Sequence, residues 1–386
     1  MDAGESQFAL TEHQRAIRDM ARGFAAEEIA PHAVDWDARK HFPADVIRGA
    51  AALGMGGICV REDVGGSGLG RVEATLIFEA LAEACPSTAA FLSIHNMVAT
   101  MIDRHGDARQ RSVLGPRLCS AEWLGSYCLT EPGSGSDAAA LRTRAVPDAD
   151  DYVLDGVKQF ISGAGTSDLY IVMARTGASG PYGISAFLVE AGTPGLSFGA
   201  EEKKMGWNTQ PTRQVILEGC RVPAANRLGE EGAGFRIALA GLDGGRLNIA
   251  ACSLGGAQAA THKAMTYMAG REAFGRRIDS FQALQFRLAD MVTSLEAARA
   301  LLWRAAAAMD AGDPRSTTLC AMAKRFATDT GFAVANEALQ LHGGYGYLAE
   351  YGIEKIVRDL RVHQILEGTN EIMRLIIARG LIEQPQ

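Results

Sequence analysis

The hydrophobic pattern of this chain changes twice, near residue 123 and again near residue 235, and these changes restrict its fold more than any other feature. In the first and last segments, apolar residues recur at the three- and four-residue spacing of helices. In the middle segment the apolar runs are short and are separated by turn residues. Closely spaced short strands favour a compact β domain, and long antiparallel helices pack as a bundle. We therefore expect an α+β fold with an N-terminal helical domain at residues 1–122, a β domain at 123–234 and a helical bundle at 235–386.

Local signals predict several element boundaries. Thr11 and Gln14 have the spacing of a capping box, which predicts a helix start there. Asp155-Gly156 separates the apolar runs Tyr152–Leu154 and Val157–Ile161, and it predicts a two-residue hairpin turn. Gly312 falls between two long Ala-rich segments, so we expect it to separate two helices of the bundle.

Composition narrows the function classes. The chain has 38 Lys+Arg against 45 Asp+Glu, which gives a formal net charge of −7. This balance argues against nucleic acid or an anionic membrane surface as the main partner. The first residues lack an apolar signal core, and no run of about 18 apolar residues predicts a membrane span. We expect a soluble cytoplasmic protein.

The seven cysteines are scattered along the chain and form no C-x-x-C pair. An odd and dispersed set argues against a disulfide framework or a zinc site. We therefore expect buried thiols in a reducing compartment and no bound metal.

A loop of small residues follows an apolar run in Tyr127–Asp137, whose sequence is YCLTEPGSGSD. Such loops let backbone N–H groups approach an anion or the edge of a ring. Gly133, Gly135 and Ala138 fit a relaxed dinucleotide-binding fingerprint, but no helix and βαβ unit follow, so we reject that interpretation. On spacing alone, an ordinary loop is the better interpretation.

A glycine turn at Gly343–Gly346 follows a helical segment. C-capping of that helix explains the glycines without any ligand. With the neighbouring aromatic residues, the same glycines would also let a flat or phosphorylated ligand approach the backbone. His342 by itself is more typical of a hydrogen-bonded core histidine than of a catalyst.

Glu367 lies between Leu366 and Gly368, in a short break between two helical segments. Apolar neighbours would desolvate its carboxylate and raise its pKa toward a value suited to a general base. A surface glutamate, or an acid at the N-terminus of the next helix, explains the residue more simply. Composition alone favours that simpler interpretation.

The sequences of six segments, and their order along the chain, resemble those of the acyl-CoA dehydrogenase family across nearly the whole chain. These segments are Tyr127–Asp137, Phe160–Gly163, Asp243–Arg246, Arg271–Gly275, Gln340–Gly344 and Glu367–Thr369. Ser93–Met97, Gly206–Arg213 and Val362–Gly368 further resemble the branch of the family that acts on isobutyryl-CoA. The resemblance implies an α-helical domain, a β-barrel domain and a four-helix bundle, assembled as a homotetramer with one FAD per subunit.

The resemblance also implies which residues hold the FAD. The loop at Tyr127–Ser136 and the segment Phe160–Ser162 are expected to line the flavin, and residues of the C-terminal domain to reach the FAD of a neighbouring subunit. The expected FAD-binding residues are Tyr127, Cys128, Leu129, Thr130, Gly133, Ser134, Gly135, Ser136, Phe160, Ile161, Ser162, Arg271, Phe274, Phe281, Gln282, Gln340, Gly343, Gly344, Thr369, Asn370 and Glu371.

By the same resemblance, Glu367 removes the α-proton of an acyl-CoA thioester while a hydride leaves the β-carbon for the flavin. The residues expected to contact the substrate are Ser136, Asp243, Gly244, Gly245, Arg246 and Arg379. Isobutyryl-CoA is the expected substrate and methacrylyl-CoA the product, as in valine catabolism. An electron-transfer flavoprotein is the expected electron acceptor.

Three positions depart from common family patterns. Gly245 stands where isovaleryl- and long-chain-type relatives place the base, which leaves Glu367 as the only matching candidate. Leu366 replaces the tyrosine of many straight-chain relatives, which changes the pocket wall beside the α-carbon. In the third departure, at the segment Phe160–Ser162, many relatives carry tryptophan and threonine at the first and last residues, so the surface that stacks on the flavin is smaller here.

Several alternatives stay open at this point. Within the family's chemistry they are a 2-methylbutyryl-CoA or butyryl-CoA dehydrogenase, or an oxidase that passes electrons to oxygen. Outside catalysis, a scaffold that binds acyl-CoA without reacting could share the fold. The intact Glu367 and the cofactor segments argue against such a scaffold.

Overall fold

The computed structural model describes residues 10–383, and their contacts divide into two compact units that are described separately. The helical unit comprises the chain up to Asp37, Gly70–Ala90 and the chain from Arg246 onward. The mixed unit comprises Ala38–Leu69 and Phe91–Gly245. The α+β class expected from the sequence is confirmed. The expected boundaries at residues 122 and 234 stay a prediction.

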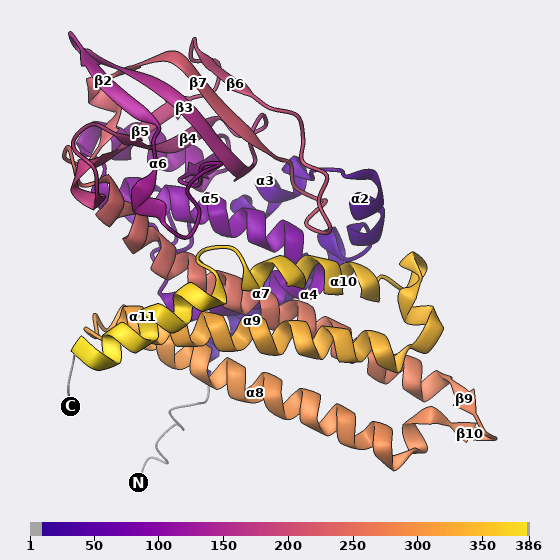
Figure 1. Ribbon diagram of the computed structural model, residues 1–386. Coiled ribbons are helices and arrows are strands. Elements are labelled where there is room, and N and C mark those ends of the chain that lie inside the picture. The colour runs from indigo at the N-terminus through magenta and orange to yellow at the C-terminus, as the bar shows by residue number, and fades with distance from the viewer. Residues whose placement is uncertain (1–9, 384–386) are drawn as a thin grey trace. The chain divides into compact units, whose positions relative to one another are not determined.

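Long helices make up most of the helical unit (Figure 1). The helix α7, Gly234–Gly270, contributes its residues from Arg246 onward. The other elements of this unit are α1 (Glu12–Phe24), α2 (Ala33–Arg39, as far as Asp37), α4 (Arg71–Ala84), the hairpin strands β9 (Glu272–Ala273) and β10 (Arg276–Arg277), α8 (Gln282–Asp310), α9 (Ser316–Leu341), α10 (Ile353–Arg361) and α11 (Asn370–Glu383). In Figure 1, α8 and α9 run side by side, with the β9–β10 hairpin at one end.

Helix ends in this unit follow the sequence signals. At the start of α1, the Gln14 backbone N–H donates to Thr11 Oγ1 at 3.2 Å, and the Thr11 backbone N–H donates to Gln14 Oε1 at 3.1 Å. This is the predicted capping box. Gly312 separates α8 from α9, as predicted, and its φ of 66° is left-handed, a conformation that favours glycine.

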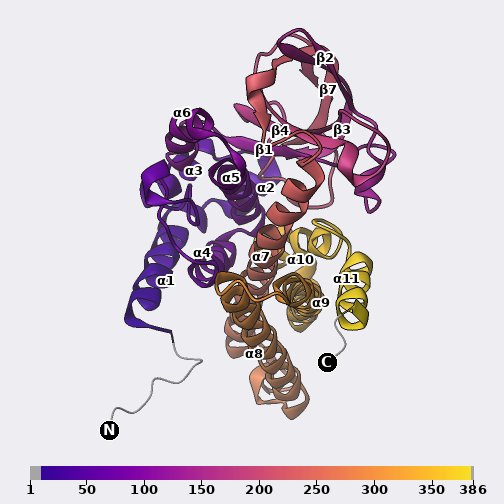
Figure 2. The ribbon, with the colours of Figure 1, turned by 90° about the vertical axis from the view of Figure 1, so that its left-hand side faces the viewer.

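The mixed unit surrounds a curled sheet with helices α3 (Ala44–Ala52), α5 (Pro86–His105, from Phe91 onward) and α6 (Ala108–Cys119). Its strands are β1 (Gly125–Cys128), β2 (Arg144–Asp148), β3 (Asp151–Ser162), β4 (Leu169–Arg175), β5 (Ile184–Glu190), β6 (Leu196–Phe198), β7 (Thr212–Pro223) and β8 (Arg227–Leu228). The order is β6-β7-β3-β2-β4-β5-β8, and β1 pairs in parallel with β4. Figure 2 shows these strands curving into an open barrel.

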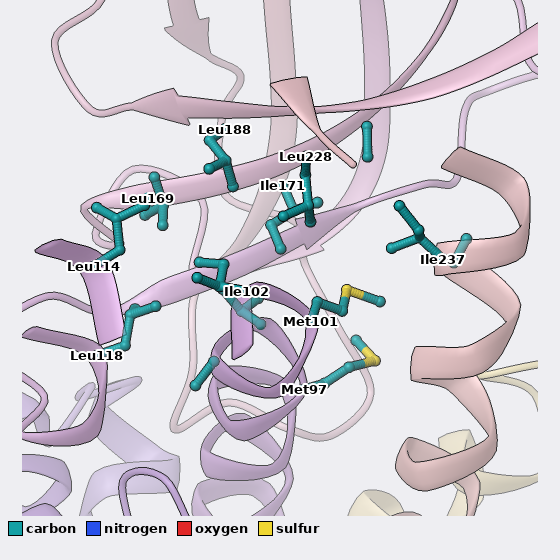
Figure 3. Close-up of a cluster of buried hydrophobic side chains, with 14 of the residues drawn as sticks. Met97, Met101, Ile102, Leu114, Leu118, Leu169, Ile171, Leu188, Leu228 and Ile237 are labelled. Atoms are coloured by element: carbon teal, nitrogen blue, oxygen red, sulfur yellow. The ribbon is translucent and has the colours of Figure 1, made fainter. Parts of the chain in front are cut away.

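Both faces of β4 are buried, which explains its unbroken apolar run. Leu169, Ile171 and Met173 pack in a cluster with side chains of α5 and α6, shown in Figure 3. The alternate residues Tyr170 and Val172 point to the other face and join a second cluster with β3, β5 and β7. A strand covered on both sides cannot show the polar alternation of a half-buried strand.

The hairpin predicted at Asp155-Gly156 is wrong. Strand β3 runs through both residues, and the register shift between Leu154 and Gly156 marks a β-bulge. Gly156 is required there because its φ is 152° and a Cβ atom would lie 2.4 Å from Thr143 Oγ1. The real turn lies one strand earlier, at residues 149 and 150, where Asp148 pairs with Asp151.

Candidate active site

Glu367 lies in a strained turn of the helical unit, between the short helix η9 (Val362–Gln364) and α11. Its φ is 53° and that of Gly368 is 91°, so two consecutive residues are left-handed. For a residue other than glycine this conformation costs about 1–2 kcal/mol. The φ of Gly368 is one that other residues rarely adopt, so the backbone favours glycine directly after the glutamate. Strain of this kind persists only where the surrounding contacts enforce it.

Helix α9 clamps both ends of this turn through one side chain. Asp329 Oδ1 accepts hydrogen bonds from Gln364 Nε2 at 2.8 Å and from Asn370 Nδ2 at 2.7 Å. Asn370 also donates to Thr328 Oγ1 at 3.0 Å. The residue before Glu367's loop and the residue after it are therefore fixed to the same carboxylate.

Lys324, one turn earlier on α9, holds the middle of the turn. Its buried Nζ donates to the backbone oxygen of Gly368 at 2.8 Å and to Asn370 Oδ1 at 3.0 Å. Burial lowers the pKa of Lys324 to about 8, against the opposite effect of Glu367.

Helix α7 supports the turn from another side. Arg246 Nε donates to the backbone oxygen of Glu367 at 3.2 Å. Further along α7, Ser253 Oγ lies 2.7 Å from His363 Nδ1. Burial lowers the pKa of His363 to about 3, so this imidazole stays neutral and serves as a packing and hydrogen-bonding group.

The Glu367 carboxylate is prepared to accept a proton. The residue is half-buried, but its Oε2 atom is shielded from solvent and has no hydrogen-bond partner among the described residues. Burial raises the pKa of Glu367 to about 7, although Arg246 and Lys324 act to lower it. A general base works best with a pKa near the working pH, and Glu367 meets that condition.

In the mixed unit, the loop after β1 is built around a buried ion pair. Lys158 Nζ lies 2.7 Å from Glu131 Oε1, and both side chains are buried. Glu131 also accepts the backbone N–H groups of Arg142 at 2.6 Å and Thr143 at 2.9 Å. Burial alone would raise the pKa of Glu131, but Lys158 and these N–H groups together lower it. The charged pair therefore fixes the start of the glycine loop.

The predicted cofactor residues of this unit differ in whether their side chains or only their backbone atoms can face a ligand. Phe160 has a φ of 60° at a bulge of β3, and its side chain is 64% exposed. The side chains of Cys128, Leu129 and Ile161 are buried in the hydrophobic clusters, so only their backbones can face a ligand. Ser162 is half-buried, and its backbone oxygen accepts Ser126 Oγ at 2.6 Å.

The remaining predicted residues of the loop after β1 are more open. Tyr127 and Thr130 are half-buried, Ser134 is buried with its Oγ on the backbone oxygen of Asp137, and Gly133, Gly135 and Ser136 are exposed. A Cβ atom at Gly133 or Gly135 would meet no atom of the chain within 4 Å. The chain itself therefore does not require glycine at these positions.

A separate set of predicted residues gathers near the β9–β10 hairpin of the helical unit. Phe274 is 96% exposed at its tip and meets Phe281 edge-on, with ring centroids 6.2 Å apart. The Arg271 guanidinium lies 5.6 Å from the Tyr345 ring centroid. Gln282, Gln340, Gly343 and Gly344 are exposed as well. This is an aromatic and cationic surface, here called the hairpin surface: Arg271, Phe274, Phe281, Gln282, Gln340, Gly343, Gly344 and Tyr345.

Within the helical unit, the structure brings Glu367, Arg246, Thr369 and Asn370 together but leaves others outside. Asn370 is buried, and its amide is engaged with Lys324, Thr328 and Asp329. Thr369 Oγ1 accepts the Ile372 N–H at 3.3 Å and caps α11. Glu371 and Arg379 are exposed on α11. Asp243, Gly244 and Gly245 lie on the part of α7 that belongs to the mixed unit, where Asp243 is half-buried and both glycines are buried.

Sequence reasoning missed Lys324 and Asp329, which hold the Glu367 turn in the helical unit, and the Glu131–Lys158 pair, which holds the loop after β1 in the mixed unit. A lysine or aspartate in an Ala-rich helix is usually a solvated charge. The available signal was position, because Lys324 follows the buried residues Cys320 and Ala321 at helical spacing.

Comparison with known proteins identifies the class. Three family models match the chain: acyl-CoA dehydrogenase N-terminal domain at residues 11–122, middle domain at 126–220 and C-terminal domain at 232–382. This chain belongs to the acyl-CoA dehydrogenase family. It is an acyl-CoA dehydrogenase in the sense of that family, a flavin-dependent oxidoreductase that acts on a CH–CH bond.

Individual relatives narrow the resemblance further. Isobutyryl-CoA dehydrogenase of Bos taurus, named as mitochondrial, is 54% identical over 380 residues, covering 98% of this chain and 91% of that protein. The mitochondrial isobutyryl-CoA dehydrogenase of Dictyostelium discoideum is 56% identical over 373 residues, covering 96% of this chain and 90% of that protein.

Solved structures share the whole fold. The butyryl-CoA dehydrogenase of Megasphaera elsdenii has a TM-score of 0.95 at 38% identity, over 98% of this chain and all of that one (100%). A chain from the structure described as the electron transferring flavoprotein of Acidaminococcus fermentans has a TM-score of 0.96 at 41% identity, over 98% and 100% of the two chains. The fold is thus the acyl-CoA dehydrogenase fold, with helical N- and C-terminal domains and a β middle domain.

Members of this family are FAD flavoproteins, and the described residues fit that cofactor. The open space beside Gly133 and Gly135 gives the backbone of the loop access to an anionic or flat group. The exposed Phe160 ring offers a surface for stacking a planar ring system.

Among the described residues, no helix is long and apolar enough to cross a membrane. The two isobutyryl-CoA dehydrogenases are named as mitochondrial, so the cytoplasmic location expected from the sequence stays a prediction.

Proposed function

We propose that this enzyme oxidises isobutyryl-CoA to methacrylyl-CoA and that Glu367 is the base that removes the α-proton. The observation that carries the assignment of the base is the buried, unpartnered Glu367 Oε2 at a strained turn, with the pKa of the carboxyl raised to about 7. Identities of 54% and 56% to isobutyryl-CoA dehydrogenases over nearly the whole chain support the substrate.

The proposed reaction requires a base held close to the α-carbon and a hydride acceptor for the β-carbon. The α-C–H of a thioester is a weak acid, so the base must be held close to it and away from water. Glu367 Oε2 accepts the proton, because burial raises the pKa of its carboxyl group to about 7 and makes it a stronger base than an exposed glutamate. FAD, when bound, supplies the hydride acceptor for the β-carbon. The turn clamped by Asp329 and Lys324 fixes where the proton goes.

We place FAD on the loop after β1, Tyr127–Ser136, and on Phe160–Ser162, with Thr369 and Glu371 as further contacts. Cys128, Leu129 and Ile161 would contribute backbone atoms only, since their side chains are buried. Asn370 would act by ordering the start of α11 rather than by touching the cofactor. Ser136, Asp243, Gly244, Gly245, Arg246 and Arg379 form the proposed acyl-CoA contacts.

We further propose a homotetramer in which the hairpin surface reaches the FAD of a neighbouring subunit, and an electron-transfer flavoprotein as electron acceptor. The exposed aromatic rings of the hairpin surface support the first point. The full-length likeness to a chain from the Acidaminococcus fermentans electron transferring flavoprotein structure supports the second. The three-domain division with boundaries at 122 and 234 belongs to the same proposal.

The test combines a substrate panel with two matched variants. Anaerobic flavin bleaching is followed with isobutyryl-, 2-methylbutyryl-, propionyl-, butyryl- and octanoyl-CoA. Isobutyryl-CoA is expected to give the highest kcat/KM, with the other short thioesters within about 10- to 200-fold, because one methylene in an apolar pocket is worth about 1–3 kcal/mol. A preference for butyryl- or octanoyl-CoA would refute the substrate and leave the base standing.

Glu367→Gln is expected to retain FAD but to lose flavin reduction by about 10²-fold or more. The control is Glu350→Gln, which removes an exposed carboxylate from the same unit and should react like the parent. Reduction of the E367Q flavin at the parent rate would remove Glu367 from its role, whichever thioester is preferred.

A further inference from the structure

Lys324 carries a charge that its direct hydrogen bonds do not need. Its two acceptors, the Gly368 backbone oxygen and Asn370 Oδ1, are both neutral, and a neutral donor would satisfy them. Burying an ammonium group costs several kcal/mol unless other charges offset it. The cation in this helix therefore calls for an explanation beyond holding the fold.

The position of the ammonium group supplies that explanation. Gly368 directly follows Glu367, and Asn370 begins α11, so both bonds of Lys324 end on the segment that carries the carboxylate. Glu367 is the anion with the largest effect on Lys324. The Gly368 bond ties the left-handed turn to α9 at the peptide that follows the strained residue.

We propose that Lys324 is a positioning residue for the base: its ammonium group holds the Glu367–Asn370 turn against α9 and keeps the Glu367 carboxylate ionised until the α-proton arrives. The inference rests on the proposed role of Glu367. It assigns to Lys324 no contact with substrate or cofactor.

The other charged groups around the turn come from three elements. Arg246 on α7 adds positive charge beside both Glu367 and Lys324. Asp329 on α9 and Glu371 on α11 are negative and favour the ammonium form of Lys324. His363 in η9 is neutral, because burial and Lys324 both lower its pKa. Cys252 on α7 stays a thiol, because burial raises its pKa and Glu367 raises it further.

These charges determine the direction in which loss of the Lys324 charge moves the pKa of Glu367. Burial favours the neutral form of Glu367, whereas Lys324 and Arg246 favour the anion. Removal of the Lys324 charge leaves burial opposed by Arg246 alone, so the pKa of Glu367 rises further. Less of the enzyme then holds an anionic base at pH 7, and the low-pH limb of the rate profile moves to higher pH.

The experiment compares Lys324→Met, Lys324→Gln and Lys324→Arg as FAD-loaded enzymes. The rate constant and the KM for anaerobic flavin reduction by isobutyryl-CoA are measured from pH 5.5 to 9. For K324M and K324Q the low-pH limb is expected to move upward by about one pH unit or more. The rate at pH 7 falls about 10- to 100-fold with little change in KM, because the base is both less ionised and less well placed. Lys324→Arg keeps the positive charge, so it should keep the low-pH limb at the parent position.

Two controls separate positioning from a general effect of losing a buried lysine. Lys355 is buried in the same unit and pairs with Asp359 at 2.6 Å, so Lys355→Met should lower the melting temperature without moving the limb. In a Glu367→Gln background, Lys324→Met should add no further loss of rate, because the group it acts through is gone.

An unmoved low-pH limb in folded K324M or K324Q would overturn the proposal, as would full additivity with E367Q. Failure of both neutral variants to fold would make Lys324 a structural residue and equally overturn it. If instead E367Q itself reduces flavin normally, the proposed base is wrong, and that result is read without any Lys324 variant.

Discussion

Two unfavourable features meet at Glu367, a left-handed backbone and a carboxylate oxygen that has no hydrogen bond within residues 10–383. Neither helps the chain to fold, since each raises the free energy of the native state. The hydrogen bonds of Asp329, Lys324 and Arg246 hold the turn in spite of this. Residues that fold at such a cost are expected where chemistry requires them.

The raised pKa of Glu367 makes a prediction about stability. The folded pKa of about 7 lies above the ordinary value of 4.5, so between these pH values the folded protein holds a proton that the unfolded chain has released. Stability therefore falls as pH rises from about 4.5 to about 7 and the contribution is constant above that. Glu367→Gln cannot ionise, so it should be more stable than the parent by about 1–3 kcal/mol at pH 8, with the difference vanishing near pH 5.

Thermal unfolding of the parent and E367Q at pH 5, 6, 7 and 8 measures this difference. E350Q serves again as control, because its carboxylate is exposed. If E367Q were more stable than the parent by the same amount at every pH, burial would not be raising the pKa of the Glu367 carboxyl group.

At the scale of secondary-structure elements, strand β3 stabilises the loop after β1 through one side chain. Lys158 projects from β3 and neutralises Glu131, whose other acceptor bonds hold residues 142 and 143. The ion pair thus connects the loop that we propose for FAD with the strand that carries Phe160. Removing one partner would leave a buried charge on the other.

Lys158→Met is therefore expected to destabilise the protein by about 3–5 kcal/mol and to weaken FAD retention. The double variant Glu131→Gln/Lys158→Met removes the stranded charge and should regain part of that stability. Melting temperature and the flavin-to-protein absorbance ratio after gel filtration report the two effects. Parent-like values for K158M would mean that the loop does not depend on this pair.

Individual elements show which boundaries could be predicted from the sequence. The capping box at Thr11 and the break at Gly312 are local signals and are correct. The hairpin predicted at Asp155-Gly156 was wrong, because the same dipeptide suits both a hairpin turn and a β-bulge. The contact that decides between them is with Thr143, which lies in a different segment of the chain. Strand β2 has the sequence RAVPD with only Ala145 buried, so it carries no alternation of buried apolar residues that would predict a strand.

The candidate site was predictable in part. Glu367 was found through its family segment, because its composition alone suggested an ordinary surface acid. Lys324 meets its acceptors at sequence separations of 44 and 46 residues, which no local pattern contains. The buried character of Cys128 and Ile161 likewise depends on the second hydrophobic cluster of the mixed unit, formed only when the strands curl together.

At the scale of the whole molecule, the hairpin surface is the part of the helical unit that bears on the proposed tetramer. Phe274 is 96% exposed and meets the Phe281 ring, and the Arg271 guanidinium lies near the exposed Tyr345 ring. Soluble monomers rarely leave a contiguous aromatic patch uncovered. A second copy of this chain would cover it in the proposed tetramer.

Arg271→Ala is expected to lower FAD occupancy by about 10-fold or more while leaving the far-ultraviolet circular dichroism unchanged, because a bidentate cation is lost from the proposed shared site. Arg109→Ala, at an exposed position on α6, is the control. Sedimentation velocity and flavin content measure assembly and occupancy. A fully flavin-loaded monomer of the parent protein would contradict the shared site.

The clamped turn has a consequence for how the enzyme is made. Glu367 reaches its supports backwards along the chain, across 121 residues to Arg246 on α7, while Gly368 reaches back 44 residues to Lys324 on α9. A ribosome adds both helices before it adds the glutamate, and domains begin to fold during synthesis. A nascent chain that ends before residue 367 therefore already contains Arg246 and Lys324 but lacks the proposed base. The proposed active site can form only after residues 364–370 have been added and have made their hydrogen bonds to α7 and α9.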